Sequence, residues 1–528
     1  MELDRPITRR RFVVAAGALV AAGATPRILN PAVAKAAPPW SASLFTLGVA
    51  SGDPTADSVI LWTRLAPDPL AGGGMPSRPV SVRWQVARDE AMHHVVRRGV
   101  AHARPEFAHS VHVDVKGLEP GREYFYRFVA GPQESPVGRT RTTPHERSSE
   151  ELNFAFVSCQ DWQNGYYSAF RRLAAEDVDF IVHLGDYIYE YGPEGKVRPG
   201  SPPARVHDGP EVFSLESYRN RHALYKTDTA LQAAHAAAPW VLTWDDHEVE
   251  NNYAGQIPEE DSSPPGDFAV RSANAIRAYY EHQPVRSSSL LAKSGPRLYR
   301  TIDWGRLAQF HVLDTRQYRT DQPCGDGLKN CDGRFDPGAT MTGADQERWL
   351  LRGLDRSPAR WNVLAQQTIF AEVDFNPAPG SVGPAGLFNV DQWDGYVAQR
   401  RRISQFLADR KPSNPVVITG DIHSSWANDV KLDYDNPASP TVASEFVGTS
   451  ISSDFPAVFI APVNAALVDN PHIKFFDGEF RGYVLCSVTP ERWRTDFRAV
   501  ASVDAPDAPV STLRSFVVEN GEPGVKPA

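Results

Sequence analysis

The sequence predicts an α/β protein preceded by a small all-β domain, and three observations lead to this prediction. Between about residues 44 and 143, short runs alternate apolar and polar residues, with turn residues between them, as antiparallel strands do. After residue 150, apolar strand-like runs alternate with longer helical segments, which is typical of a layered α/β domain. The length of 528 residues allows two or three domains. We therefore expect a β-sandwich domain at 40–143 and an α/β domain at 151–515.

The expected strands of the first domain lie between turns such as Pro120-Gly121. These strands are Val59–Trp62, Val80–Trp84, Val111–Val115 and Tyr124–Phe128. The segment Gly117–Tyr124 resembles the corner that precedes a late strand in fibronectin type III-like domains. Such a domain is usually architectural, and a polar linker is expected at Thr142–Glu150.

The second domain is expected to contain both strands and helices. The strand candidates are Leu152–Val157, Asp179–Leu184, Trp240–Thr243, Leu307–Leu313, Val363–Ala365 and Pro415–Thr419. The helix candidates are Tyr167–Glu176, Phe268–His282, Gly343–Leu354 and Trp393–Arg410. Residues 192–216 and 320–342 are rich in Pro, Gly and Asp, and they are expected to form surface loops.

Composition excludes several classes of protein. With 41% hydrophobic and 23% charged residues, the chain is neither disordered throughout, nor collagen-like, nor a coiled coil. The net charge of −9 gives no indication of a nucleic-acid partner, which normally meets a basic domain or stripe. Four cysteines in this length exclude a disulfide-dense scaffold. We expect a globular protein that acts as a monomer.

The first 36 residues have the features of an export signal. Residues 1–36 hold six basic and two acidic residues, and the apolar run Phe12–Ala24 has 13 residues, whereas spanning a bilayer takes about 20. Thr8–Phe12 (TRRRF) resembles a twin-arginine signal, and small residues that allow cleavage follow between Ala34 and Ala37. We expect twin-arginine export, secretion and no transmembrane segment. The alternative is a chance basic tail before a buried helix.

Export affects how the cysteines are interpreted. Cys324 and Cys331 flank a loop rich in Gly, Asp and Asn, where a disulfide is favoured outside the cytoplasm. Cys486 lies in an apolar run and is expected to fill space in a core. Cys159 differs from both because it directly follows a predicted strand.

Four apolar runs end at side chains that could hold a metal ion. These side chains are Cys159; Asp186 and Tyr189; Asp245, Asp246, His247 and Glu248; and Asp421 and His423. The carboxyl ends of strands in open α/β sheets converge on the binding crevice, so Asp186, Asp246 and Asp421 would meet there. Such crowding raises carboxylate pKa values and costs several kcal/mol, whereas a multivalent cation turns the repulsion into attraction. The pattern therefore predicts a metal site.

Each of these side chains also has an ordinary structural explanation. An Asp after a strand is most often an N-cap of the next helix, and Glu248 and Glu250 could be acidic residues at a helix start. His183 lies in an apolar run and is expected to be a core residue. The joint pattern favours the metal site, because two of the four runs end in the same Gly-Asp pair.

The strand-end blocks resemble those of metallophosphoesterases, in the variant of PhoD-type alkaline phosphatases. The blocks are Phe156–Gln160 (FVSCQ), Gly185–Tyr189 (GDYIY), Thr243–Asn252 (TWDDHEVENN) and Gly420–Trp426 (GDIHSSW). The resemblance covers about residues 40–500. Cys in the first block and Gly-Asp-x-His in the last separate the chain from purple acid phosphatases. The fold it implies is a layered β-sandwich flanked by helices, behind a fibronectin type III-like domain.

The resemblance also implies iron(III) and calcium in one cluster. Iron would be bound by Cys159, Asp186, Tyr189 and His423, and calcium by Asp186, Asp246 and Asp421. Thiolate, phenolate and imidazole suit a transition metal, whereas a carboxylate set suits calcium.

Other residues of the cluster are less certain ligands in this comparison. Asn252 is a weaker calcium candidate, and Asp245 is weaker still. Gln366 and Gln367 follow a strand where the purple acid pattern has further His ligands. This departure is consistent with a hard cation rather than zinc at the second site.

The implied activity is hydrolysis of phosphate monoesters, and of some diesters, by a metal-activated water outside the cell. His247 is the candidate that contacts the phosphoryl group or protonates the leaving group; alternatively it only orients a metal ligand. A second candidate activity is that of a phosphodiesterase or phospholipase D that acts on lipid head groups or wall polymers. The loops at 192–216, 255–266 and 374–390 would then set the width of the pocket. A non-catalytic wall- or carbohydrate-binding protein would leave the strand-end carboxylates unexplained.

Overall fold

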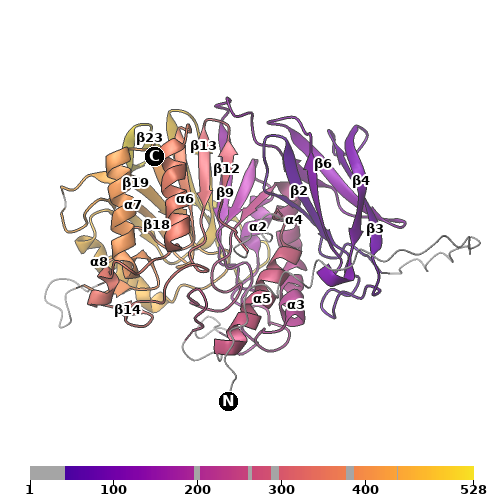
Figure 1. Ribbon diagram of the computed structural model, residues 1–528, viewed down its shortest axis with the longest axis horizontal. Coiled ribbons are helices and arrows are strands. Elements are labelled where there is room, and N and C mark those ends of the chain that lie inside the picture. Colours follow the sequence, from indigo (N-terminus) through magenta and orange to yellow (C-terminus); the bar gives the residue numbers. More distant parts are fainter. Residues whose placement is uncertain (1–41, 196–202, 260–264, 287–295, 376–385, 437) are drawn as a thin grey trace, which may run out of the picture. The chain divides into compact units, whose positions relative to one another are not determined.

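The computed structural model describes residues 42–528 except 196–202, 260–264, 287–295, 376–385 and 437. Residues Ser41–Ala528 form one compact unit (Figure 1). The predicted export signal at 1–36 lies outside the described residues, as do parts of the three loops expected to set the pocket width. No helix in the described ranges combines the length and the apolar character that a membrane span requires.

The largest sheet has ten strands in the order β24-β23-β22-β21-β9-β10-β11-β1-β2-β5. Their bounds are β1 Val49–Gly52, β2 Ser58–Arg64, β5 Ser110–Lys116, β9 Leu152–Val157, β10 Phe180–His183, β11 Trp240–Leu242, β21 Arg481–Val488, β22 Arg492–Val500, β23 Val510–Glu519 and β24 Glu522–Pro527. At its centre β9, β10 and β11 are parallel, with Val182 opposite both Phe156 and Val241. The ends of these three strands therefore lie at one edge of the sheet.

The second sheet has seven strands in the order β12-β13-β15-β17-β19-β18-β20. Their bounds are β12 Arg300–Trp304, β13 Ala308–Val312, β15 Trp361–Ala365, β17 Pro415–Thr419, β18 Ser425–Lys431, β19 Thr441–Val447 and β20 Ile473–Asp477. The four strands from β13 to β19 are parallel. Every residue of β15 and β17 is buried and most are apolar, as is usual for parallel strands that are covered on both faces.

The two sheets pack face to face and helices cover their outer faces (Figure 1). Phe154 and Phe180 of the first sheet contact Phe310 of the second, at ring-centroid distances of 5.1 and 5.2 Å. The helices are α2 Ser168–Leu173, α3 Leu215–Lys226, α4 Thr229–Ala237, α5 Pro265–His282, α6 Gly343–Arg356, α7 Val397–Arg410 and α8 Ile460–Ala466. Helices α2 to α5 share a core with the first sheet, and α6 and α7 share one with the second.

The N-terminal strands belong to two sheets. A five-stranded sheet contains β3 Val80–Ala87, β4 Val95–Ala103, β6 Glu123–Ala130, β7 Gln133–Glu134 and β8 Gly138–Arg141. By contrast, β1, β2 and β5 extend the ten-stranded sheet, because Gly52 pairs with Trp240 of β11. A short pair, β14 Leu328–Lys329 and β16 Phe388–Asn389, lies outside the main sheets. The domain boundary near residue 143 stays a prediction.

The cysteines agree with the expectations from the sequence. Cys324 and Cys331 form a disulfide, whereas Cys159 and Cys486 are free and buried. Cys486 contributes to the core between the two sheets.

Candidate metal centre

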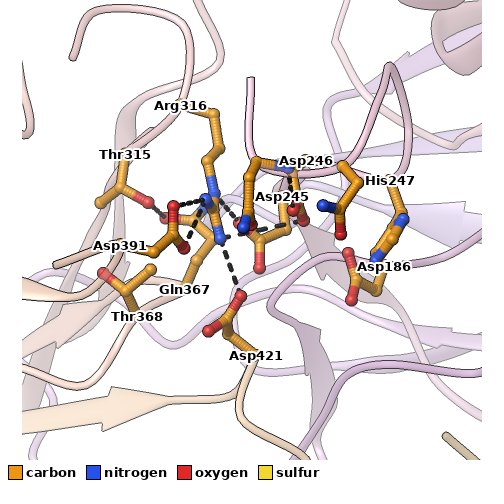
Figure 2. A network of polar contacts seen from close by, with 12 residues as sticks. Asp186, Asp245, Asp246, His247, Thr315, Arg316, Gln367, Thr368, Asp391 and Asp421 are labelled. Atoms are coloured by element: carbon orange, nitrogen blue, oxygen red, sulfur yellow. Dashed lines mark hydrogen bonds and ion pairs between the residues drawn. The ribbon is translucent and has the colours of Figure 1, made fainter. Parts of the chain in front are cut away.

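The polar residues that follow four separate strands meet at one place, between the two sheets (Figure 2). Cys159, Asp186 and Asp246 follow β9, β10 and β11 of the first sheet, and Asp421 follows β17 of the second. Backbone hydrogen bonds join the loops, since Cys159 N donates to Gly185 O over 3.1 Å. The predicted convergence of strand ends is therefore present in the structure.

Five of the eight predicted site residues have a left-handed backbone conformation. These residues are Cys159 (φ 58°), Asp186 (φ 57°), Asn252 (φ 51°), Asp421 (φ 66°) and His423 (φ 56°). A positive φ costs free energy for residues other than glycine and concentrates at functional sites. The turns at four of these residues direct their side chains into the donor groups, whereas the Asn252 amide donates to Asp326.

The two Gly-Asp pairs have a steric cause. Gly185 has a φ of 116°, and a Cβ placed on it would collide with the backbone and side chain of Asp245. A Cβ on Gly420 would collide with the side chain of Ser158. Both glycines therefore allow neighbouring ligand loops to approach closely.

The first donor group contains a thiol, a carboxylate and an imidazole. Cys159, Asp186 and His423 each offer one ligand atom, and these atoms all lie within 4.8 Å of one another. Tyr189 joins them: its hydroxyl donates to Asp186 Oδ2 over 2.9 Å and lies 3.2 Å from His423 Nε2. His423 Nδ1 donates to the carbonyl of Asp454, which leaves Nε2 facing the group. The structure thus brings together all four predicted iron ligands.

Burial acts strongly on this group. Burial raises the pKa of the Cys159 thiol well above its usual value, and the charge of Asp186 raises it further. The pKa of Tyr189 is raised well above its usual value for the same two reasons. Without a cation, thiol and phenol would both keep their protons, whereas a bound cation favours the thiolate and phenolate.

Three carboxylate oxygens at the centre have no hydrogen-bond donor. They are Asp186 Oδ1, Asp245 Oδ2 and Asp246 Oδ1, and all three atoms are buried. Asp186 and Asp246 form a second donor group with His247, and Asp245 and Asp246 form a third with Asp421. Buried acceptors without donors are rare and costly, and a cation would satisfy them. The donor set therefore fits metal ions.

An arginine that the sequence analysis did not identify lies beside the third donor group (Figure 2). The fully buried guanidinium of Arg316 pairs with Asp245, with Asp391 at 2.9 Å and with Asp421 at 2.7 Å. It is 3.8 Å from Asp246 Oδ1. Burial would lower the pKa of Arg316, but the carboxylates outweigh burial and raise it well above its usual value. Arg316 therefore remains charged and neutralises part of the acidic cluster.

Arg316 had a signal in the sequence that could have been used, whereas Asp391 had none. Arg316 follows β13 four residues after the strand ends, as the predicted ligands follow their strands. Arginine is not a usual metal ligand, so a pattern of metal-binding residues does not point to Arg316. Asp391 lies two residues after β16, but this strand is only Phe388–Asn389 and has no apolar run that would indicate it in the sequence.

His247 is clamped on three sides. Its Nδ1 lies 2.7 Å from Glu190 Oε2, its ring stacks on Tyr189 at 4.1 Å, and the edge of Tyr191 lies at 5.3 Å. Burial would lower the pKa of His247, but Glu190, Asp246 and Asp186 raise it well above its usual value. These carboxylates, with Glu190 the largest of the three effects, favour the protonated ring of His247. Glu190 is a further residue that the sequence analysis missed.

Glu248 organises the centre through its backbone contacts. Its carboxylate accepts hydrogen bonds from the backbone N–H groups of Asp186, Tyr187 and Asp245, over 3.1, 2.6 and 2.8 Å. These bonds tie the loop after β10 to the loop after β11. Glu248 therefore holds ligand loops, which differs from the helix-start role considered for it.

Asn252 is joined to the centre by its backbone. Its N–H donates to Asp246 Oδ2 over 2.7 Å, while its side-chain amide donates to Asp326. The role of Asn252 as a calcium ligand stays a prediction. Gln367 binds Thr315 Oγ1 at 2.6 Å and the carbonyl of Trp244 at 2.7 Å, so it cross-links the loops.

Comparison with known proteins identifies the family. The model of the PhoD-like phosphatase family matches residues 154–497, and the model of the PhoD-like phosphatase N-terminal domain matches residues 32–144. The chain belongs to the PhoD-like phosphatase family. Alkaline phosphatase D of Bacillus subtilis (strain 168) is 48% identical over 525 residues, which cover 98% of this chain and 88% of that protein. This PhoD-like phosphatase is a phosphoric ester hydrolase.

Solved structures agree with the fold. A structure of PhoD superposes with a TM-score of 0.88 at 48% identity, covering 93% of each chain. A purple acid phosphatase, PPD1 from yellow lupin (Lupinus luteus) seeds, superposes with a TM-score of 0.55 at 11% identity, over 89% of this chain and 74% of that one. The second likeness shows the fold alone. The predicted family and the layered, helix-flanked β-sandwich of this PhoD-like phosphatase are confirmed.

Proposed function

We propose that this chain is a secreted alkaline phosphatase that holds iron(III) and calcium in one cluster. The observation that supports the proposal is the set of overlapping donor groups with three donorless carboxylate oxygens. Cys159, Asp186, Tyr189 and His423 would hold iron, because thiolate and phenolate ligands favour a transition metal over calcium. Asp186, Asp246 and Asp421, with Asn252, would hold calcium through oxygen atoms.

Metal ions in this cluster would supply Lewis acidity, which activates a water molecule and neutralises charge on the phosphoryl group. The protein adds an imidazolium at a fixed position. Because Glu190 accepts from His247 Nδ1, the Nε2–H of His247 is free to donate to a phosphoryl oxygen or to the leaving oxygen. Of the two roles considered for His247, direct contact with the substrate is the one this geometry favours.

Arg316 would limit how many cations the cluster takes up. It already neutralises Asp245, Asp391 and Asp421 from one side. Asp186 and Asp246 share a donor group with His247 (Figure 2), whereas Asp246 Oδ1 also lies 3.8 Å from Arg316. We place calcium among Asp186, Asp246 and Asp421, with Arg316 as a permanent cation beside it.

The proposed substrates are phosphate monoesters, with diesters as further substrates. The runner-up is a phosphodiesterase or phospholipase D that acts on lipid head groups or wall polymers. The exposed side chain of Phe480 favours this second candidate over a purely polar substrate. Phe480 lies near His423, because Arg481 Nη1 donates to the backbone carbonyls of both residues. Export through the twin-arginine pathway, a monomeric state and the domain boundaries at 40–143 and 151–515 belong to the same proposal.

Elemental analysis combined with calcium chelation tests the proposal. We expect iron and calcium in the purified protein, loss of activity with a calcium chelator, and recovery when calcium is returned. Initial rates on p-nitrophenyl phosphate, bis-p-nitrophenyl phosphate and phosphatidylcholine then separate the two candidates. An active preparation that contains neither metal would contradict the proposal, and a higher rate on phosphatidylcholine than on the monoester would favour the runner-up.

A further inference from the structure

A second cluster of buried polar side chains lies among helices α3, α4 and α5, outside the set assigned to metals. At its centre is Lys226, the last residue of α3, whose side chain is buried. Its Nζ lies 3.4 Å from His235 Nε2, 4.4 Å from the ring centroid of Trp62 and 5.1 Å from that of Tyr187. In the described part of the chain, no carboxylate acts on it, and burial alone lowers its pKa well below the usual value.

The surroundings of Lys226 contain more cations than carboxylates. The buried guanidinium of Arg64 donates to the carbonyl of Ala108 over 2.9 Å and lies 2.8 Å from His282 Nε2. The acid that acts on Arg64 is Glu281, and its two carboxylate oxygens already bind Arg219, both over 2.6 Å. Arg64 and Lys226 thus have no carboxylate of their own. A buried basic group keeps its proton more easily when an anion lies beside it.

Several polar atoms without partners lie on side chains of the same helices or next to them. They are both ring nitrogens of His222, both side-chain polar atoms of Gln283, Nδ1 of His235 and the hydroxyl of Tyr279. The four side chains carrying these atoms are nine-tenths buried or more. Such groups in a folded protein normally bind an ordered water or an ion.

Helix geometry brings these atoms to one place. His222 and Lys226 are four residues apart on α3, and so are Tyr279 and Gln283 at the end of α5, so each pair shares a helix face. The two faces meet, because the rings of His222 and Tyr279 are in edge contact at 6.2 Å. The third wall is Tyr187, whose ring lies 6.1 Å from that of His222.

We propose that Lys226, His222 and Gln283 bind a small monovalent anion of the halide class, such as chloride. A water molecule could satisfy the unpartnered atoms, but it would not keep Lys226 protonated at this buried position, whereas an anion stabilises the ammonium form. A halide accepts from the ammonium, the imidazole N–H and the amide together. The aromatic walls favour a small, weakly hydrated anion over phosphate or sulfate.

The proposed anion would support the metal centre indirectly. Tyr187 directly follows Asp186, and its hydroxyl lies 2.7 Å from His235 Nε2, the atom that Lys226 also approaches. The anion would fix Lys226 and thereby the far side of the segment that carries Asp186. The inference does not depend on which phosphate ester the enzyme hydrolyses.

Thermal unfolding of the metal-loaded, full-length protein tests the proposal. Sodium bromide replaces sodium methanesulfonate at constant ionic strength, so that general salt effects cancel. For the wild type we expect the melting temperature to rise with bromide concentration, as linkage requires for a bound ligand. Lys226→Met should abolish this rise, and Gln283→Leu should shift it to higher bromide concentrations. Lys116→Met, the same change at an exposed lysine, is the matched control and should keep it.

Crystals of the wild-type protein soaked in bromide give a test that does not depend on the variants folding. We expect an anomalous difference peak within about 3.5 Å of Lys226 Nζ. A water-only site, with no bromide peak there, would overturn the proposal. An equal bromide response of Lys226→Met and Lys116→Met would overturn it as well.

Discussion

Replacing Arg316 by methionine should destabilise the protein much more without calcium than with it. The guanidinium is fully buried and pairs with Asp245, Asp391 and Asp421. Its removal leaves those carboxylates without their shared cation. Breaking a buried ion pair by removing one partner costs about 3–5 kcal/mol, so we expect a loss of this size in the free energy of unfolding when calcium has been chelated. Because Asp421 and Asp246 are proposed calcium ligands, added calcium should recover a large part of the loss.

Scanning calorimetry in chelator and in excess calcium provides the assay. Arg402→Met is the matched control, because Arg402 forms a two-bond pair with Glu347 at a partly exposed position. Such surface pairs contribute about 0–1 kcal/mol, so the control should change little in either buffer. The reasoning is refuted if Arg316→Met costs less than about 1 kcal/mol in chelator, or if calcium makes no difference to its cost.

Three further predictions concern the roles of Asp186 and His247, the absorbance of an iron–Tyr189 bond, and the buried carboxyl group of Glu445. Asp186→Asn should lose metal and activity together, whereas His247→Ala should keep its metals and lose about 10²- to 10⁴-fold in turnover; wild-type activity of both variants on p-nitrophenyl phosphate would rule out the mechanism. Bound iron with a Tyr189 phenolate should give visible absorbance, which Tyr189→Phe should remove while iron analysis shows whether the metal stays; a colourless, iron-free, active enzyme contradicts the iron assignment. Burial raises the pKa of Glu445 to about 7 from the ordinary 4.5, despite hydrogen bonds from Asn428, Phe370 and Ala371, so the folded state holds a proton that the unfolded chain releases. The corresponding stability is fully present below pH 4.5 and is lost as the pH rises through about 7, and Glu445→Gln should flatten that part of the curve of melting temperature against pH.

The sequence predicted the central strands well, because buried parallel strands are continuous apolar runs. The runs Leu152–Val157 and Pro415–Thr419 coincide with β9 and β17. Helices α3 and α4 were missed. The inner face of α3 mixes Arg221, His222 and Lys226 with apolar residues, which obscures the apolar period. Helix α4 has only nine residues and is rich in alanine, so its apolar period is weak. Their starts were still signalled by the caps Ser214 and Asp228.

At the site, the sequence predicted the residues that follow strands but not their partners. The convergence of Cys159, Asp186 and Asp246 follows from the order of the neighbouring parallel strands β9, β10 and β11. The approach of Asp421 also requires that the second sheet packs against the first. Arg316 and Glu190 act through side-chain pairs with residues far away in the chain, such as Asp421 and His247. Pairs of this kind depend on how the two sheets are placed against each other, and no local pattern records that.

Because the proposed metal ligands come from both sheets, the fold constrains when metal can bind during folding. Cys159 and Asp186 stand on one layer of the sandwich, and Asp421 and His423 stand on the other. A half-formed molecule with undocked layers would offer each ion only part of its coordination shell. Tight metal binding must therefore come late in folding, and the bound ions would then hold the two layers together through their shared ligands.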